Sequence, residues 1–144
     1  MGIGEWLQFL QDVGAFEMGL LTVPAAQQAF LWSRIRSCTS YSDVQEMRMR
    51  DLFFEDFMEA IVRLASILAL PTVEEIENAG VEDGGVFLLA LYRDEREGFD
   101  SFVAQRTQTW LGYPRQFIHR CVDHLMALFG RLVRCVLPDN SAKA

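Results

Sequence analysis

Apolar residues in this sequence recur every three or four positions in nearly all segments and rarely alternate with polar ones. The first stripe consists of Trp6, Phe9, Leu10, Val13 and Phe16. Such spacing places side chains on one face of an α-helix, whereas a half-buried strand needs alternation of apolar and polar residues. The periodicity therefore predicts an all-α fold, organised as a compact multi-helix domain.

Capping residues and helix breakers predict the next helices. Thr22 is a good N-cap for a helix over residues 25–37. The residues expected to face inward from it are Phe30, Leu31 and Ile35. The next amphipathic helix, the third in the chain, ends at Pro71. Its inward stripe comprises Phe54, Phe57, Ile61, Leu64, Ala65 and Leu68.

The rest of the chain is also predicted to be helical. Thr72 and Glu75 form a capping box that opens a short acidic helix, which Gly80 closes, and a turn follows at residues 83–85. Three further helices are expected over residues 86–96, 99–111 and 114–137. No linker rich in Gly, Pro or Ser interrupts the chain, so we expect one helical domain over residues 1–137 and a polar tail over residues 138–144.

The long last helix separates apolar from polar side chains around its circumference. At about 100° per residue, its apolar residues fall within one half of the helical wheel. They are Phe117, Ile118, Cys121, Val122, Leu125, Met126, Leu128, Phe129, Leu132, Val133, Cys135 and Val136. A helix of this kind is either the main core helix of its own domain or a surface that binds a partner, and the sequence leaves both open.

The chain is acidic overall, but its charge is unevenly distributed. Its 144 residues carry 13 basic and 20 acidic side chains, a net charge of −7, which argues against general nucleic-acid binding. Residues 1–100 carry a net charge of −11, whereas residues 101–144 carry +4. Either the last helix packs beside the acidic part and neutralises it, or it presents a cationic face to an acidic partner.

The cysteines and the apolar stretches suggest a cellular location. Cys38, Cys121 and Cys135 form no CxxC pair and are typical of small buried residues in a reducing compartment. The first residues lack the basic segment of a secretory signal. The longest apolar stretch, residues 60–70, contains Arg63 and is shorter than the roughly 20 residues of a membrane span. We therefore expect a cytoplasmic protein without a membrane span.

The segment Leu52–Ala65 reads LFFEDFMEAIVRLA and resembles the end of an EF-hand loop with its exiting helix. An apolar residue, an acidic pair, a phenylalanine and a Glu-Ala pair follow in the order typical of the EF-hand superfamily. Residues 30–34 match the entering helix of the same hand. Over residues 22–70 the chain is similar to degenerate calmodulin-like domains of ciliary and flagellar proteins, and to tubulin-associated proteins of the p25-alpha type.

The same alignment removes the calcium ligands. Loop positions 1, 3 and 5 are Gln45, Met47 and Met49, and position 6, where the sharp turn needs Gly, is Arg50. Calcium takes about six to eight oxygen ligands, which these side chains do not supply. A second possible loop, over residues 93–104, fails in the same way. The resemblance therefore implies a hand held by packing, and we expect no calcium site and no cofactor.

The sequence contains no strong catalytic motif. It has no glycine-rich phosphate-binding motif, no HExxH and no GxSxG. His119 and Asp123 lie one helical turn apart, where a hydrogen-bonded surface pair is the ordinary interpretation. Cys121 and His124 are a weak candidate for nucleophilic catalysis, which needs a base that a third group orients toward the nucleophile. We therefore expect a protein that is not an enzyme.

Two sets of residues are candidates for partner binding. One set is apolar beyond what the core stripe needs and comprises Met47, Met49, Phe53 and Met58. Met-rich grooves in EF-hand relatives accept a partner helix, although core filling is the simpler explanation. The other set is cationic and comprises Arg115, Arg120, Arg131 and Arg134.

These residues lead to two alternative functions. The first is a calcium-independent protein–protein interaction module that binds a helix or an acidic surface such as a tubulin tail. The resemblance implies that it acts in a cytoskeletal, ciliary or flagellar assembly. The second is a structural domain that associates with itself as a homodimer, through its last helix or its Met and Phe patch.

Overall fold

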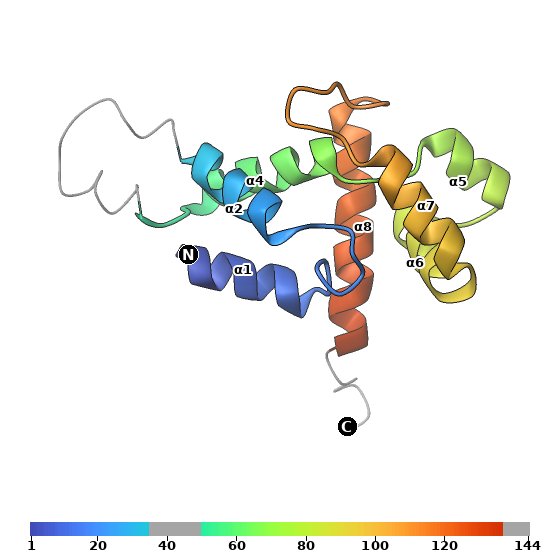
Figure 1. Ribbon diagram of the computed structural model, residues 1–144, viewed down its shortest axis with the longest axis horizontal. Helices are drawn as coiled ribbons and strands as arrows, with labels where there is room; N and C mark the ends of the chain where they lie inside the picture. Colours follow the sequence, from blue (N-terminus) through green and yellow to red (C-terminus); the bar gives the residue numbers. More distant parts are fainter. Residues whose placement is uncertain (35–49, 137–144) are drawn as a thin grey trace, which may run out of the picture.

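The computed structural model describes residues 1–34 and 50–136, with side chains up to residue 134 (Figure 1). In these residues the chain forms seven α-helices and no strand, which confirms the predicted all-α fold. The helices are α1 (Ile3–Asp12), α2 (Val23–Ser33), α4 (Phe54–Ile67), α5 (Val73–Ala79), α6 (Gly84–Asp94), α7 (Arg96–Arg106) and α8 (Ile118–Val136).

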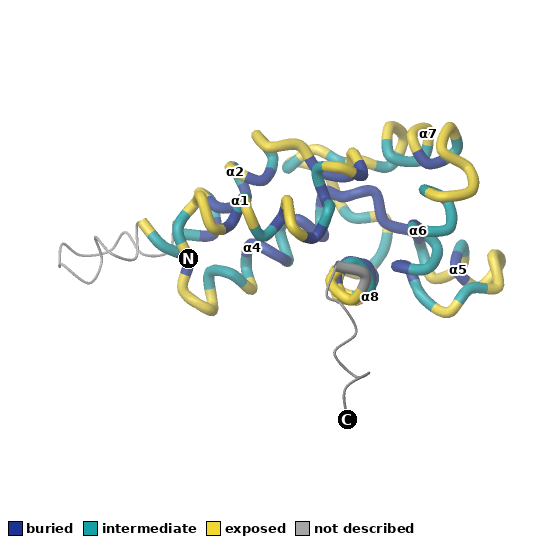
Figure 2. Tube along the Cα trace, turned by 90° about the horizontal axis from the view of Figure 1, so that it is seen from below, coloured by how far each residue is buried: buried dark blue, intermediate teal, exposed yellow. Residues whose placement is uncertain are grey.

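Helix α8 lies between two groups of helices. Helices α1, α2 and α4 lie on one side of it, and α5, α6 and α7 lie on the other (Figure 1). Seen end-on, α8 runs along one edge of the molecule and exposes part of its circumference (Figure 2). Its buried residues Leu125, Leu128 and Phe129 belong to the same hydrophobic cluster as residues from both groups. Helix α8 therefore links the two groups through one core.

Aromatic side chains fill the core between α1, α4 and α8. Trp6 is fully buried, and its Nε1–H donates a hydrogen bond to the carbonyl oxygen of Ala26 at 2.9 Å. The ring centroid of Phe9 lies 6.0 Å from that of Trp6, 5.7 Å from that of Phe57 and 6.0 Å from that of Phe129. Contacts between rings at these distances, edge-to-face between Phe9 and both Phe57 and Phe129, add to the free energy of apolar burial.

Helix α6 approaches α8 through two glycines. A Cβ atom on Gly85 would lie 2.8 Å from the backbone of Ala127 and Leu128. A Cβ atom on Gly84 would lie 2.7 Å from the Cβ of His124. Because neither glycine carries a side chain, the first turn of α6 can rest directly on the backbone of α8.

Several predicted helix ends are confirmed. The Thr22 hydroxyl accepts a hydrogen bond from the backbone N–H of Ala25 and caps α2. Thr72 and Glu75 form the capping box at the start of α5. Gly80 ends α5 in the left-handed conformation, with φ of 66°, which glycine adopts without steric cost.

Other predicted bounds are wrong, for a local reason at the start of α6 and a distant one at the end of α7. Helix α6 begins two residues earlier than predicted, since the Asp83 carboxylate accepts a hydrogen bond from its first turn. Helix α7 ends at Arg106 and not at Leu111. The backbone N–H of Gln108 donates instead to the carbonyl oxygen of Ile67 at the end of α4, at 2.8 Å.

Six of the described side chains that the periodicity placed on apolar faces are exposed: Leu31, Phe54, Phe117, Ile118, Met126 and Val133. Helix α8 begins at Ile118, so Phe117 precedes the helix and does not follow its wheel. Phe54 is the first residue of α4, where the side chain extends past the core, and it is 77% exposed. Leu31 is exposed because α2 buries the face that carries Ala26 and Phe30.

The EF-hand-like unit is only partly within the described residues. Helices α2 and α4 pack against each other. The first five positions of the degenerate loop, residues 45–49, lie outside the described residues, so the expected lack of calcium binding stays a prediction. Residues 93–104 do not form a second loop, because Gly98 lies inside α7.

Candidate docking surface

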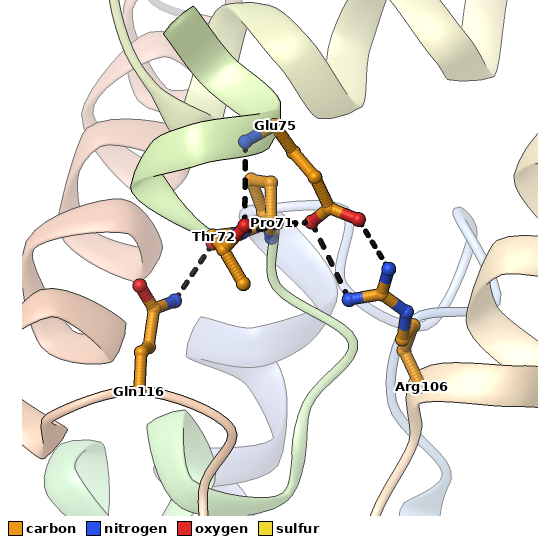
Figure 3. A network of polar contacts seen from close by, with 5 residues as sticks. All are labelled: Pro71, Thr72, Glu75, Arg106 and Gln116. Atoms are coloured by element: carbon orange, nitrogen blue, oxygen red, sulfur yellow. Dashed lines mark hydrogen bonds and ion pairs between the residues drawn. The ribbon is translucent and has the colours of Figure 1, made fainter. Parts of the chain in front are cut away.

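Residues 107–117 join α7 to α8, and hydrogen bonds hold this segment at both ends. Near its start, Gln108 donates its backbone N–H to Ile67, as described above. Near its end, the Gln116 side-chain amide donates to the carbonyl oxygen of Pro71 at 2.7 Å (Figure 3). Between them, Gly112 N–H donates to the Thr109 carbonyl oxygen in a turn. The segment is therefore fixed to the end of α4 and to the connection between α4 and α5.

An ion pair reinforces this attachment. The guanidinium of Arg106, the last residue of α7, contacts both carboxylate oxygens of Glu75 (Figure 3). Glu75 Oε2 also accepts a hydrogen bond from the backbone N–H of Thr72 at 2.9 Å. Burial pushes the pKa of Glu75 upward, but the hydrogen bonds from Thr72 and Arg106 outweigh it, so the pKa lies below its ordinary value. The charged pair thus fastens the end of α7 to the start of α5.

This fixed segment presents large apolar side chains to solvent. Leu111 is 94% exposed, Tyr113 is 92% exposed and Phe117 is 79% exposed. Single exposed apolar residues are common on proteins, but three such residues within seven positions of one tethered segment are unusual. Clusters of exposed apolar residues mark interaction surfaces.

Arginines accompany these apolar residues. An open groove of about 740 Å³ runs between the segment and the start of α5, and Arg115, Phe117 and Arg120 line one side of it. Glu74 is the acidic residue among its lining side chains. Arg115 and Arg120 are exposed, and neither makes an ion pair with another residue of the described chain. We call Leu111, Tyr113, Arg115, Phe117 and Arg120 the docking surface.

A small cavity of about 20 Å³ lies beneath the segment. Cys121 lines it together with Gln108 and Gln116, and burial raises the pKa of the Cys121 thiol. A thiol held in its protonated form is a poor nucleophile. His124, which the sequence offered as a base for Cys121, is buried against Gly84 at the contact between α6 and α8. Burial there lowers the pKa of His124.

The cationic residues predicted for partner binding do not form one surface. Arg115 and Arg120 meet in the groove. Arg131 instead pairs with Asp83 and lies 3.3 Å from a carboxylate oxygen of Glu82. Arg131 on α8 therefore neutralises acidic residues of its own chain and does not present its charge to a partner. Arg134 is exposed near the end of α8, more than 10 residues along the helix from Arg120.

The apolar residues predicted for partner binding lie elsewhere. Phe53 is the N-cap residue of α4 and Met58 is in its second turn, and both are partly exposed. Neither belongs to the buried core, so core filling does not account for them. Met47 and Met49 lie outside the described residues.

The charge on Asp83 gives a testable contribution to stability. Hydrogen bonds from Arg131 hold the pKa of Asp83 below its ordinary value. The carboxylate therefore stabilises the fold above about pH 3.9, the unfolded-state pKa, and this contribution is lost as the pH falls through the lower folded-state pKa. We expect Asp83→Asn, which keeps an N-cap side chain, to lower the free energy of unfolding near neutral pH. The difference from the wild type should shrink in acid, measured by urea denaturation.

Glu82→Gln is the matched control, because Glu82 contacts the same arginine from a side chain that is 82% exposed. Exposed ion pairs contribute little, so this variant should change stability less than Asp83→Asn. Equal losses for the two variants, or a loss for Asp83→Asn that does not depend on pH, would contradict the role of the pair.

Sequence reasoning missed the apolar members of the docking surface. Leu111 was expected at the end of a helix, and Phe117 was expected on the apolar half of the last helix. Gly112 and Pro114 are a loop signal, and the predicted helices stop and start on either side of Tyr113. The connection is longer than this signal indicates, because it runs from residue 107 to residue 117.

Comparisons with known proteins add no relative. No family model, no curated protein and no solved structure matches the chain. Within residues 1–34 and 50–136, no group of three or more His, Cys, Asp or Glu side chains is placed to hold a metal ion. None of the helices in that part of the chain is both long and apolar enough to cross a membrane.

Proposed function

We propose that this protein is a calcium-independent protein–protein interaction module that is not an enzyme, and that its docking surface binds an acidic segment of a partner. One observation carries the proposal: Leu111, Tyr113 and Phe117 are largely exposed on one tethered segment, and Phe117 lines the groove together with the unpaired Arg115 and Arg120. Aromatic residues and arginines are the side chains that dominate the energetics of protein interfaces.

The chemistry of the surface favours an acidic partner with apolar side chains. Guanidinium groups bind carboxylates through two parallel hydrogen bonds, and Arg115 and Arg120 are both available for this. Apolar side chains of the partner would cover Phe117 and its neighbours, which removes apolar surface from water. Because the tethers at Gln108 and Gln116 already order the segment, binding costs little loop entropy.

The proposed setting is a cytoplasmic cytoskeletal assembly, such as a cilium or flagellum. The support comes from the resemblance of residues 22–70 to calmodulin-like and tubulin-associated proteins. The acidic tails of tubulin have the charge that the docking surface would bind. Calcium independence rests on Gln45, Met47 and Met49, which stand where a calcium loop needs oxygen ligands.

The state of the reactive side chains supports a binding role without catalysis. Burial keeps Cys121 as a thiol and favours neutral His124, and both lie under the surface and away from the open groove. His119 is exposed near the groove, but its ring stacks on that of Phe117, with centroids 5.9 Å apart. It therefore extends the aromatic surface.

Charge reversal of the groove arginines tests the proposal. We expect wild-type protein to cosediment with microtubules, and to bind less after the acidic tubulin tails are removed with subtilisin. Arg115→Glu combined with Arg120→Glu should weaken binding at least about tenfold, a loss of about 1.4 kcal/mol, because two attractive contacts become repulsive. Phe117→Ala should also weaken binding, through lost apolar contact.

Arg93→Glu is the matched control, because Arg93 is an exposed arginine on α6, outside the groove lining. It should leave microtubule binding close to the wild-type value. Arg134→Glu tests whether the partner also contacts the far end of α8. If it weakens microtubule binding as much as the double variant does, the binding surface extends along the helix beyond the groove. Binding that survives the double charge reversal, or that ignores the loss of the tubulin tails, would refute the acidic-partner proposal.

A further inference from the structure

A second exposed patch occupies the start of α4. Phe54 is 77% exposed and Met58 is 46% exposed, and their spacing of four residues places them on one stripe of the helix. Glu55 and Glu59 form the neighbouring stripe at the same spacing. We call these four residues the α4 opening.

The charge of this patch is opposite to that of the docking surface. Residues 50–59 contain four acidic residues and one basic residue, Arg50, and the charges of Asp51 and Asp56 act on Arg34. Asp56 accepts a hydrogen bond from the backbone N–H of Phe53, and Glu59 pairs with Arg63 at 2.8 Å. Glu55 is the acidic member of the α4 opening for which the described residues supply no ion pair, and it is exposed beside Phe54.

The two patches match in composition as well as in charge. The docking surface offers exposed rings and aliphatic groups next to Arg115 and Arg120. The α4 opening offers an exposed ring and a thioether next to Glu55. An apolar stripe flanked by an acidic stripe is the chemistry that the docking surface was argued to bind. Complementary patches of this kind favour one register of docking.

The two patches cannot meet within one molecule. The last residue of α4, Ile67, accepts the hydrogen bond from Gln108, so the C-terminal end of α4 lies under the segment that carries the docking surface. Helix α4 has 14 residues. At about 1.5 Å per residue its first turn lies roughly 20 Å from that end. Figure 1 shows the same separation, with α4 starting at the far end of its group and running toward α8.

We propose that the α4 opening of one molecule docks on the docking surface of a second copy, so that the protein associates head to tail. This inference rests on the docking surface of the proposed function and names one acidic segment that it binds. Since each molecule contributes a different patch, the contact is heterologous, and it extends into a chain of subunits unless the rotation between copies closes a ring. It differs in this respect from a two-fold homodimer.

A mixing experiment tests the proposal. One variant carries Arg115→Glu and Arg120→Glu, which disables the docking surface. The other carries Phe54→Ser and Met58→Ser, which disables the α4 opening at positions outside the buried core. We expect the mass of the wild type to rise with concentration in sedimentation velocity runs. Each variant alone should stay monomeric, and an equal mixture should form a dimer and nothing larger, because one intact patch of each kind remains.

Other outcomes overturn the proposal. The contact is excluded if the wild-type protein stays monomeric at high micromolar concentration. It is also excluded if the mixture of the two variants stays monomeric although both variants have the thermal midpoint of the wild type and are therefore folded. A variant that dimerises alone indicates a two-fold interface. Microtubule binding, measured in parallel, separates the two proposals: if Phe54→Ser/Met58→Ser binds like the wild type and no self-association occurs, only the head-to-tail contact is wrong. If the arginine variant also binds like the wild type, the proposed function is wrong as well.

Discussion

Gly85→Ala is expected to destabilise the protein by about 1–3 kcal/mol, the usual range for overpacking at a close contact. The added methyl group would lie 2.8 Å from the backbone of Ala127 and Leu128. Backbone atoms cannot rotate away, so α6 would have to move off α8, the helix that joins the two halves of the core. The measurement is the free energy of unfolding from urea denaturation, followed by circular dichroism.

Gly130→Ala is the matched control. It adds the same methyl group, but its effect on the free energy of unfolding should have the opposite sign. Gly130 lies in α8, where a Cβ atom would meet nothing within 4 Å. Alanine is favoured over glycine inside a helix by roughly 0.5–1 kcal/mol, so this variant should be more stable than the wild type. If both variants shift stability in the same direction, the close approach of α6 to α8 is not what Gly85 provides.

Trp6→Ala is expected to cost about 3–5 kcal/mol, the range for truncating a fully buried aromatic residue. The indole contacts Phe9 and Phe57, and its loss leaves a cavity in the core between α1 and α4. It also leaves the Ala26 carbonyl oxygen without its donor. Because a domain of this size has a total stability of about 5–15 kcal/mol, the thermal midpoint should fall sharply or the protein should not fold.

Two further substitutions separate the causes. Trp6→Phe keeps a ring but removes the hydrogen bond to Ala26, so it should cost less than Trp6→Ala. Trp32→Ala truncates a half-buried indole that packs on Trp110, and it should cost less again. A Trp32→Ala variant as unstable as Trp6→Ala would mean that the full burial of Trp6 does not set the size of its contribution to stability.

The fold class and the capped helix ends could be predicted from the sequence because both depend on local patterns. Spacing of apolar residues is enough to identify helices, and Thr72, Glu75 and Gly80 act on their own helix. The end of α7 could not be predicted, because it depends on a hydrogen bond between Gln108 and Ile67, which are distant in sequence. Local propensity carries no information about such a partner.

The candidate site was predictable only in part, for a related reason. Arg115 and Arg120 stand out as cations in the basic last third of the chain. Phe117 was misplaced because the helical wheel assumed a helix from residue 114, whereas α8 starts at Ile118. A helical wheel gives no valid orientation for residues 114–117, because they are not part of the helix. The pairing of Arg131 with Asp83 also depends on how α6 packs against α8.

Trp110 lies within the segment that carries the docking surface, and its ring centroid is 5.0 Å from that of Trp32 on α2. The remaining tryptophan, Trp6, is fully buried in the core. The protein therefore contains intrinsic fluorophores in two different environments: a coupled indole pair beside the docking surface, and one shielded indole that depends only on the fold. Quenching by acrylamide distinguishes the two, so occupancy of the surface and integrity of the core can be followed in one unlabelled sample.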